Sequence, residues 1–260
     1  MRIIGTSDYE QMSCRAASLL AAQVLLKKDC VLGLATGSTP LGIYRCLIEW
    51  YEKGMLDFSK VHSVNLDEYC GLSPEHDQSY AYYMRENLFR HINIDPANTH
   101  IPNGLAEDPE GEGARYDALI RSLGGTDIQL LGIGHTGHIG FNEPAGEYVG
   151  PTHRVELNPK TIEANSRFFA SMDDVPRYAV TMGIGSIMNA KKILLVASGG
   201  DKADILYRSF FGPITPQVPA SVLQLHPDVT VVADEAAMAV KKRPKLWNKR
   251  EKCKIVRPPH

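Results

Sequence analysis

Five short runs rich in aliphatic and β-branched residues recur along the chain, with segments of helical periodicity between several of them. Runs of five or six such residues are typical of strands buried on both faces of a sheet. Alternation of these strands with helices predicts an α/β fold with a mostly parallel sheet. The runs are Val31–Ala35, Val61–Leu66, Ile128–Ile133, Ile193–Ala197 and Val229–Ala233.

Three segments carry the signals of a helix start. Ser7 and Glu10 have the spacing of a capping box ahead of apolar residues at helical intervals, so we expect the first helix to begin there. Thr39 precedes Pro40, which predicts a second helix with Thr39 as N-cap and proline in the first turn. The periodicity predicts a third helix over residues 79–91.

No internal repeat and no Pro- or Gly-rich linker divides the 260 residues, so we expect a single domain over residues 1–240. Residues 241–260 form a tail with nine basic residues and one acidic residue, although the whole chain has 28 Lys+Arg against 30 Asp+Glu. A basic tail can bind nucleic acid, but Trp247, Ile255 and Val256 interrupt this one. We interpret it as a solvated surface or assembly segment and expect no nucleic-acid partner.

The cysteines and the apolar stretches exclude several classes of protein. The five cysteines are an odd, scattered set without a CxxC pair, which indicates neither a disulfide framework nor a zinc site. The longest apolar stretches are far shorter than the about 20 residues that a membrane helix needs, and the N-terminus lacks a secretory pattern. We therefore expect reduced cysteines, no metal, no membrane partner and a cytoplasmic location.

Polar clusters follow directly after four of the apolar runs. Because the carboxyl ends of parallel strands meet at one edge of a sheet, we expect these clusters to line a single ligand-binding crevice. The clusters are Thr36–Pro40, Asp67–Tyr69, Gly134–His138 and Ser198–Lys202.

The first cluster has the composition of a phosphate cradle. Gly37 allows an anion to approach the backbone, Ser38 and Thr39 supply hydroxyl groups, and the N–H groups at the following helix start favour negative charge. The cluster is not a Walker loop, because no Gly-Lys-Ser/Thr ends it. A strand-to-helix turn with a good cap explains the same residues, so both interpretations stay open at this point.

The third cluster overlaps the segment Gly132–Gly137, which formally matches the dinucleotide pattern GxGxxG. Nicotinamide binding at this pattern needs a long helix after it, whereas Gly140 and Pro144 predict an irregular loop. His138 and Glu143 in that loop point to proton transfer, with the carboxylate orienting or charging the imidazole. A purely structural hydrogen bond is the alternative for this histidine.

The second cluster contains the adjacent acids Asp67 and Glu68. In an extended segment, neighbouring side chains point to opposite sides, so only one of the two can face the crevice. We expect one of them to act as a general base, while a pair of ordinary surface acids is the alternative.

Four motifs, in this order and spacing, closely resemble those of the glucosamine-6-phosphate deaminase family. The resemblance extends from Met1 to Glu235 and implies a Rossmann-like α/β fold with helices on both faces of the sheet. It also implies conversion of D-glucosamine 6-phosphate and water to D-fructose 6-phosphate and ammonia. No metal or organic cofactor is implied, because a 2-amino sugar carries its own aldehyde once the ring opens. The motifs are Leu34–Pro40, Asn65–Tyr69, Gly137–Pro144 and Asn165–Phe169.

The resemblance also implies roles for individual residues. His138, with Glu143 as its carboxylate partner, acts on the proton transfers of ring opening. Asp67 takes the proton from carbon 2 and delivers it to carbon 1 before ammonia leaves. The residues implied to hold the substrate phosphate are Arg167 and Lys202 together with Gly37, Ser38 and Thr39.

This sequence departs from the best-known enterobacterial members at two places. Thr136 stands where they have an aspartate that completes a relay with the histidine and the glutamate, so we expect a supporting, uncharged role for it. Those members also bind an activator, N-acetylglucosamine 6-phosphate, through basic residues after the glutamate motif. Here His153 and Val155 stand where cations are expected. We therefore expect no allosteric activation, and a monomer and a homo-oligomer both remain open.

Two other functions fit the same scaffold. A 6-phosphogluconolactonase hydrolyses a lactone and needs no carbon-2 base, so Asp67 within Asn65–Tyr69 favours the deaminase. A non-catalytic sugar-phosphate-sensing module of a transcription regulator would lack the pair His138 and Glu143 and would carry a DNA-binding domain. The sequence has no separate helix-turn-helix segment for such a domain.

Overall fold

The computed structural model describes residues 1–158, 162–163, 169, 171–239 and 255–256. In chain order, the elements are β1 (Arg2–Thr6), α1 (Tyr9–Leu26), β2 (Val31–Leu34), α2 (Leu41–Glu52), β3 (His62–Asn65), β4 (Asp67–Tyr69), α3 (Tyr80–Asn87), η1 (Phe89–His91), η2 (Pro96–Asn98), β5 (Thr99–His100), α4 (Pro109–Ser122), β6 (Ile128–Leu131), β7 (His153–Glu156), η3 (Met172–Asp174), β8 (Tyr178–Thr181), α6 (Ile184–Met188), β9 (Ile193–Ala197), η4 (Gly200–Lys202), α7 (Ala203–Phe211), η5 (Pro219–Leu225), β10 (Val229–Asp234), α8 (Glu235–Met238) and β11 (Ile255–Val256).

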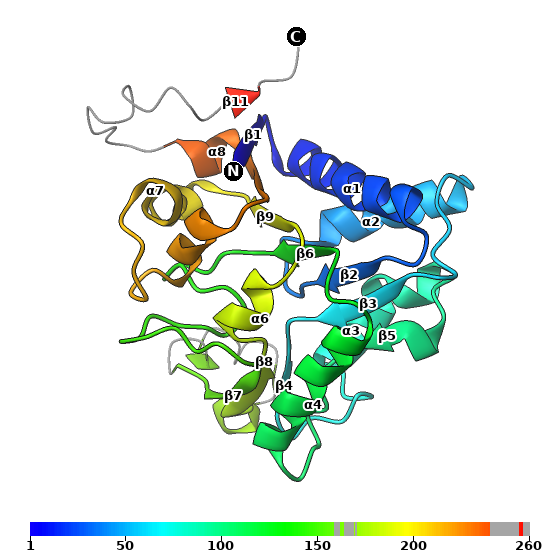
Figure 1. Ribbon diagram of the computed structural model, residues 1–260, viewed down its shortest axis with the longest axis vertical. Helices are drawn as coiled ribbons and strands as arrows, with labels where there is room; N and C mark the ends of the chain where they lie inside the picture. Colours follow the sequence, from blue (N-terminus) through cyan, green and yellow to red (C-terminus); the bar gives the residue numbers. More distant parts are fainter. Residues whose placement is uncertain (159–161, 164–168, 170, 240–254, 257–260) are drawn as a thin grey trace.

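The strands form two sheets. The large sheet has the order β11-β1-β10-β9-β6-β2-β3-β5, and each neighbouring pair in it is parallel. The small sheet has the order β4-β8-β7 and is antiparallel. Helices α1 and α2 lie on one side of the large sheet, and α4, α6 and α7 lie on the other (Figure 1). The chain therefore has the expected α/β, Rossmann-like architecture.

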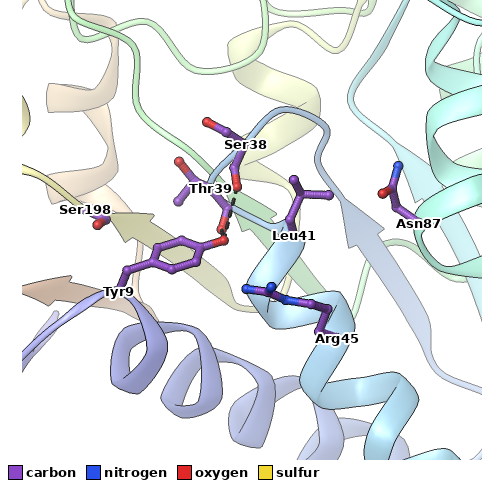
Figure 2. Close-up of a pocket in the computed structure, with 7 residues that line it drawn as sticks. All are labelled: Tyr9, Ser38, Thr39, Leu41, Arg45, Asn87 and Ser198. Atoms are coloured by element: carbon purple, nitrogen blue, oxygen red, sulfur yellow. Dashed lines mark hydrogen bonds between the residues drawn. The ribbon is translucent and has the colours of Figure 1, made fainter.

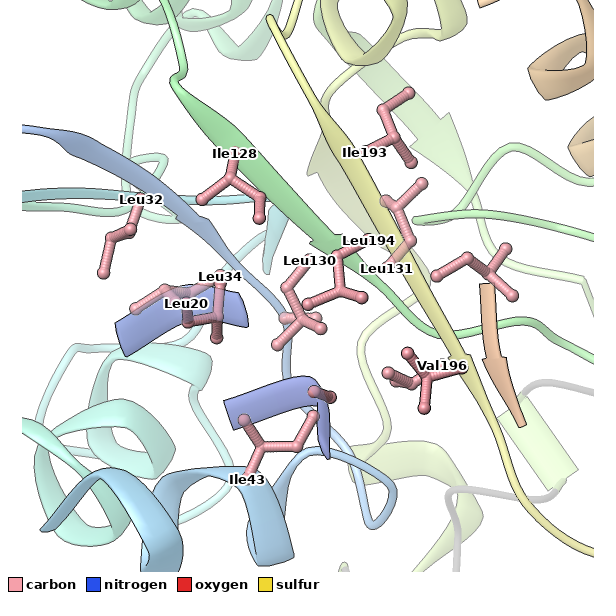
Figure 3. Packing of buried hydrophobic residues seen from close by; sticks show 14 of the residues in the cluster. Leu20, Leu32, Leu34, Ile43, Ile128, Leu130, Leu131, Ile193, Leu194 and Val196 are labelled. Carbon is pink, nitrogen blue, oxygen red and sulfur yellow. The ribbon is translucent and has the colours of Figure 1, made fainter. Parts of the chain in front are cut away.

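The core of the molecule lies on both faces of the large sheet. Every residue of β2, β6, β9 and β10 is buried, which requires apolar cover on both sides. Leu20 from α1 and Ile43 from α2 pack toward Leu34 of β2 and Leu130 of β6 (Figure 3). This packing aligns the central strands and fixes where their carboxyl ends emerge.

All five strands expected from the aliphatic runs are confirmed, as β2, β3, β6, β9 and β10. The sequence did not predict the N-terminal strand β1 or the short strands β4, β5, β7, β8 and β11. Most of these have only two to four residues, too few for a clear periodic signal.

The expected capping box at the first helix is wrong by one residue. The N-cap is Asp8, whose Oδ1 accepts a hydrogen bond of 2.8 Å from the N–H of Gln11. Ser7 donates its hydroxyl to the Asp8 carboxylate instead of capping the helix itself. Aspartate is as good an N-cap as serine, and it carries the charge that the helix dipole favours.

The other two expected helices also differ from the structure, the second at its start and the third at its end. The helix α2 begins at Leu41, and Thr39 does not cap it. The N–H of Gly42 is instead satisfied by the hydroxyl of Tyr9, at 2.8 Å, from a distant helix. The segment expected as one helix over residues 79–91 is α3 followed by η1, because Leu88 leaves the helical conformation with φ −145° and ψ −61°.

The basic tail, residues 241–260, lies outside the described residues except for Ile255 and Val256. These two pair in parallel with Ile3 and Ile4 of β1 at the edge of the large sheet. Over the described ranges, no helix combines the length and the apolar character needed to cross a membrane.

An ion cluster around the buried carboxylate of Asp127 connects the beginnings of β2 and β6. The Asp127 carboxylate accepts 2.8 Å from the N–H of Val31 and 2.7 Å from the Nζ atoms of both Lys27 and Lys191. Burial alone would raise the pKa of Asp127, but the hydrogen bonds from Lys191, Lys27 and Val31 outweigh it and lower the pKa. The ionised form is therefore stabilised by folding.

We predict that Asp127→Asn lowers the free energy of unfolding by about 1–3 kcal/mol at pH 7, because donors to a charged acceptor lose their partner. Since the pKa of Asp127 is lowered in the folded state, the stabilisation is present at neutral pH and is lost as pH falls through that pKa. Urea unfolding at pH 7 and at pH 3 measures both effects. The matched control is Asp29→Asn, an exposed aspartate in the same region, and an equal loss in that control would contradict the prediction.

Candidate active site

The loops that follow β2 and β9 share a cavity of about 520 Å³ (Figure 2). Ser38 and Thr39 come from the first loop and Ser198 from the second, so two of the polar clusters lie side by side. Asp67 and His138 do not line this cavity. Its lining residues are Tyr9, Ser38, Thr39, Leu41, Arg45, Asn87 and Ser198.

The remaining loops join this group through side-chain contacts. Asp201, after β9, lies 3.5 Å from Nδ1 of His135, after β6. Tyr80 of α3 connects the first loop with β4, since its hydroxyl bonds the side chain of Thr36. Burial raises the pKa of Tyr80 well above its usual value, and the nearby charges of Tyr69 and Asp67 add to the rise.

The residues between β6 and β7 form the expected irregular loop, and it lies against the small sheet. The N–H of Phe141 donates 3.1 Å to Oγ1 of Thr181 in β8, and Asn142 donates 2.9 Å to the carbonyl of Met182. Thr181 is also the register partner of Asp67. At Gly140, with φ +57°, an added Cβ would come within 2.8 Å of the Thr181 hydroxyl and 3.5 Å of Oδ2 of Asp67. The loop and Asp67 are thus held together through one strand.

His138, Glu143 and Thr136 form a hydrogen-bonded triangle within this loop. Nδ1 of His138 lies 3.1 Å from Oε1 of Glu143 and 2.9 Å from Oγ1 of Thr136. Thr136 donates its only hydroxyl proton to Oε2 of Glu143, at 2.8 Å, so it can only accept from the imidazole. Nδ1 therefore carries a proton, and Nε2 is the ring atom left to exchange one.

The backbone leaves room for this imidazole. A Cβ placed on Gly134 would come within 2.0 Å of Nε2 of His138, so only glycine fits beneath the ring. The N–H of Gly134 also donates a hydrogen bond of 3.0 Å to the carbonyl of His138, which folds the loop back on itself. These contacts orient the ring without covering it, because the side chain is 29% exposed.

The two adjacent acids have separate environments, as the extended backbone of β4 requires. Glu68 accepts hydrogen bonds from three backbone N–H groups, those of Tyr69, Tyr80 and Ala81, and thereby caps the start of α3. Burial raises the pKa of Glu68, although these three donors act to lower it. Glu68 is therefore a structural residue.

Asp67 receives no such donors from the described residues. Its side chain is buried, and burial together with the charge of Glu68 raises its pKa to about 8. A carboxylate that is desolvated and poorly compensated is a stronger base than an ordinary one. Asp67 is the acid of the pair with the properties of a general base.

Of the residues expected at a phosphate, Gly37, Ser38 and Thr39 form the turn between β2 and α2, and Lys202 stands at the start of α7. Burial lowers the pKa of Lys202, while Asp201, with Oδ2 3.7 Å from Nζ, opposes the change. Arg167 lies outside the described residues.

Sequence reasoning missed three residues that build this site. Asp234, at the end of β10, accepts from the Ser198 hydroxyl and from the N–H of Gly199, and so shapes the loop before Lys202. Tyr9 and Tyr83 bond the backbone of the first loop. Their partners are 29 to 46 positions away, so no local spacing could reveal them.

Within the part of the chain that the structure describes, no three His, Cys, Asp or Glu side chains are grouped so as to hold a metal ion. The chemistry available to the described site consists of a buried carboxylate base, an oriented imidazole and N–H, hydroxyl and ammonium donors. This set suits proton transfer on a bound anion.

Residues 8–232 match the family described as glucosamine-6-phosphate isomerases and 6-phosphogluconolactonases. The chain belongs to that family. Two branches are named in this description, an isomerase branch and a lactonase branch, and the similarity to individual proteins separates them.

The similar proteins at high identity are deaminases. The glucosamine-6-phosphate deaminase of Lachnoclostridium phytofermentans is 60% identical over 89% of this chain and 98% of that protein. The protein of the same name from Clostridioides difficile is 56% identical over 94% of this chain and 98% of that protein.

Solved structures give the same division of the family. A monomeric glucosamine-6-phosphate deaminase superposes with a TM-score of 0.88 at 48% identity, covering 91% of this chain and 98% of that one. The 6-phosphogluconolactonase of Trypanosoma cruzi has a TM-score of 0.72 at 18% identity, covering 91% of this chain and 95% of that one. The lactonase likeness is one of fold alone.

We predict that Asp67→Asn stabilises the fold at alkaline pH. The pKa of Asp67 is about 8 in the folded chain and about 3.9 in an unfolded one, so folding retains a proton between these values. The wild-type fold therefore loses stability as pH rises from 4 to 8, whereas the asparagine variant lacks this contribution. The midpoint of thermal unfolding at pH 5 and pH 9 measures the difference. An identical decline in both proteins would contradict it.

Proposed function

We propose that this chain is a glucosamine-6-phosphate deaminase, which converts D-glucosamine 6-phosphate and water to D-fructose 6-phosphate and ammonia. The observation that carries the proposal is Asp67, a buried carboxyl of raised pKa held beside the loop of His138. Lactone hydrolysis needs no base at carbon 2, whereas aldose–ketose isomerisation does. High identity to proteins named as deaminases supports the same branch.

His138 carries the first step in this proposal. Nε2 is the ring atom free to move a proton from the hydroxyl at carbon 1 to the ring oxygen, which opens the pyranose to the aldehyde. Glu143 accepts from Nδ1–H and stabilises the imidazolium that forms transiently. The neutral hydroxyl of Thr136 bonds both Glu143 and the imidazole and fixes their relative orientation.

Asp67 carries the second step. Its carboxylate takes the proton from carbon 2, which the aldehyde acidifies. The electrons of that C–H bond form the carbon 1–carbon 2 double bond of an enolamine, while the aldehyde oxygen takes up the proton that the substrate ammonium releases. Return of the proton to carbon 1 gives an iminium at carbon 2. Water adds there, and ammonia leaves to give the ketone of fructose 6-phosphate. One proton moves between two carbons of the substrate, so no redox cofactor is needed.

The substrate phosphate provides the anchor. Gly37, Ser38, Thr39 and Lys202 are the described residues suited to bind it, and Arg167 completes the set by resemblance. Lys202 is half-buried, where an ammonium–phosphate contact is stronger than in water. Binding energy from this remote group orients the reacting carbons against Asp67 and His138.

We further propose that residues 1–240 act as one catalytic domain with the tail 241–260 appended, in the cytoplasm, and without nucleic-acid or membrane partners. The similar deaminase described as monomeric supports a monomer that works alone. A base, an imidazole and phosphate donors all come from this one chain.

The direct test incubates the purified protein with glucosamine 6-phosphate in the presence of a chelator and measures fructose 6-phosphate and ammonia together. We expect equimolar release of both. Asp67→Asn should lose about 10²–10⁴-fold in turnover, as when a positioned general base is removed. Asp29→Asn is the matched surface control. No ammonia release by the wild type, or near-normal turnover of the Asp67 variant, would overturn the proposal.

A second test concerns the neutral member of the triangle. Thr136→Val removes the hydroxyl that bonds His138 and Glu143, whereas Thr136→Ser keeps it. We expect about tenfold lower kcat/KM in the valine variant, because about one net hydrogen bond of orientation is lost, and near-normal values in the serine variant. Equal rates in the two variants would show that Thr136 has no supporting role.

A further inference from the structure

We propose that Tyr9 and Tyr83 are positioning residues that hold the loop Thr36–Thr39 with its N–H groups turned toward the substrate phosphate. The inference rests on the proposed function in so far as this loop binds the phosphate. Tyr9 and Tyr83 bind backbone carbonyls of the loop and act on the substrate through it. Both act by binding the opposite, carbonyl side of the loop.

Tyr9 binds the second half of the loop. Its hydroxyl lies 3.1 Å from the carbonyl oxygens of both Ser38 and Thr39, and its proton is shared between them (Figure 2). The same oxygen accepts 2.8 Å from the N–H of Gly42 at the start of α2. One hydroxyl thus joins three backbone groups, and the first residue of α1 is fixed against the loop.

Tyr83 binds the first half of the loop from the other side. Its hydroxyl, which comes from α3, donates 2.6 Å to the carbonyl of Gly37. Tyr44 of α2 bonds both backbone groups of Ala35 in the same way, just before the loop. Tyrosine hydroxyls from α1 and α3 therefore bind the loop Thr36–Thr39 itself, and one from α2 binds the residue just before it.

The planarity of the peptide bond converts these carbonyl contacts into an orientation of donors. In a trans peptide, the C=O of one residue and the N–H of the next point in opposite directions, and every described peptide bond is trans. Binding of the Gly37 carbonyl by Tyr83 therefore turns the N–H of Ser38 away from α3. Binding of the Ser38 carbonyl by Tyr9 does the same for the N–H of Thr39.

These two N–H groups donate to no other described residue. The Thr39 carbonyl precedes Pro40, which has no N–H, so the set of oriented donors ends there. Gly37 itself has φ +99°, a conformation that other residues rarely adopt, and it leaves open space above the loop. Two unpaired donors beside an open glycine are suited to an anion.

The Tyr83 hydroxyl keeps its proton, and the packing of α1 against α2 holds Tyr9 in place. Burial raises the pKa of Tyr83, and the neighbouring Tyr9 adds to the rise, so the phenol stays protonated over the working range of pH. At Gly42, an added Cβ would lie 3.0 Å from the Tyr9 hydroxyl and 2.3 Å from Oγ of Ser13. Only glycine at this position allows α1 to bring Tyr9 onto the loop.

The experiment compares Tyr9→Phe, Tyr83→Phe and the double variant with the wild type. Each substitution removes one oxygen and keeps the ring. The matched control is Tyr82→Phe, on the same helix as Tyr83, whose ring lies against Arg85 and whose hydroxyl bonds none of the loop carbonyls. The readouts are KM and kcat for glucosamine 6-phosphate, the inhibition constant of inorganic phosphate, and the rise in Tm that inorganic phosphate produces.

We expect each single variant to raise KM and the phosphate inhibition constant about 3- to 10-fold, as for loss of about one net hydrogen bond, with kcat within about twofold of wild type. The phosphate-induced rise in Tm should shrink in step, while the Tyr82 variant stays at wild-type values. Wild-type phosphate inhibition in the double variant, or a fall in kcat alone, would overturn the inference. The Tm readout needs no turnover, so a wild-type protein without deaminase activity would refute the function and leave this inference testable by phosphate binding.

Discussion

Parallel strands all end at the same edge of a sheet, and the site of this protein depends on that constraint. Because β2, β6, β9 and β10 are buried on both faces, the polar side chains around them gather in the loops at the strand ends. The turns after β2, β6 and β9 are therefore neighbours although about 65 to 165 residues separate them along the chain. Apolar packing by helices such as α1 and α2 thus determines where the proposed phosphate-binding and acid–base residues lie.

The two adjacent acids of β4 differ in role, since Glu68 is structural and Asp67 has the properties of a general base. In the extended backbone of β4, Glu68 turns to the N-terminus of α3 and is satisfied by three N–H groups. Asp67 lies beside Gly140 of the loop that contains His138, and burial and the charge of Glu68 raise its pKa. The charge that makes Glu68 a good helix cap also makes Asp67 a stronger base. The stability of the fold and the basicity of Asp67 are therefore coupled through this pair. Burying Asp67 in its charged form lowers the free energy of unfolding.

Local patterns in the sequence were sufficient for the five strands β2, β3, β6, β9 and β10 and for the separate directions of Asp67 and Glu68. They failed where a long-range contact decides the outcome. Thr39 has the composition of an N-cap, yet α2 uses the hydroxyl of Tyr9, 33 positions away. The strands β4 and β8 are too short to show a period, although they position Asp67. Tyr9 and Tyr83 carry no signature, because their partners are backbone carbonyls that any residue would offer.

The strand β8 contacts both Asp67 and the loop that contains His138. Thr181 is paired with Asp67 and also bonds the N–H of Phe141, and Met182 bonds both Leu66 and Asn142. Asp67 and the loop of His138 are thus both held by β8 and the residue after it, whereas the loops at Ser38 and Lys202 follow strands of the large sheet. Contacts with that one strand and the residue after it therefore set the distance between Asp67 and the loop of His138, and none of these contacts comes from the loops at Ser38 and Lys202.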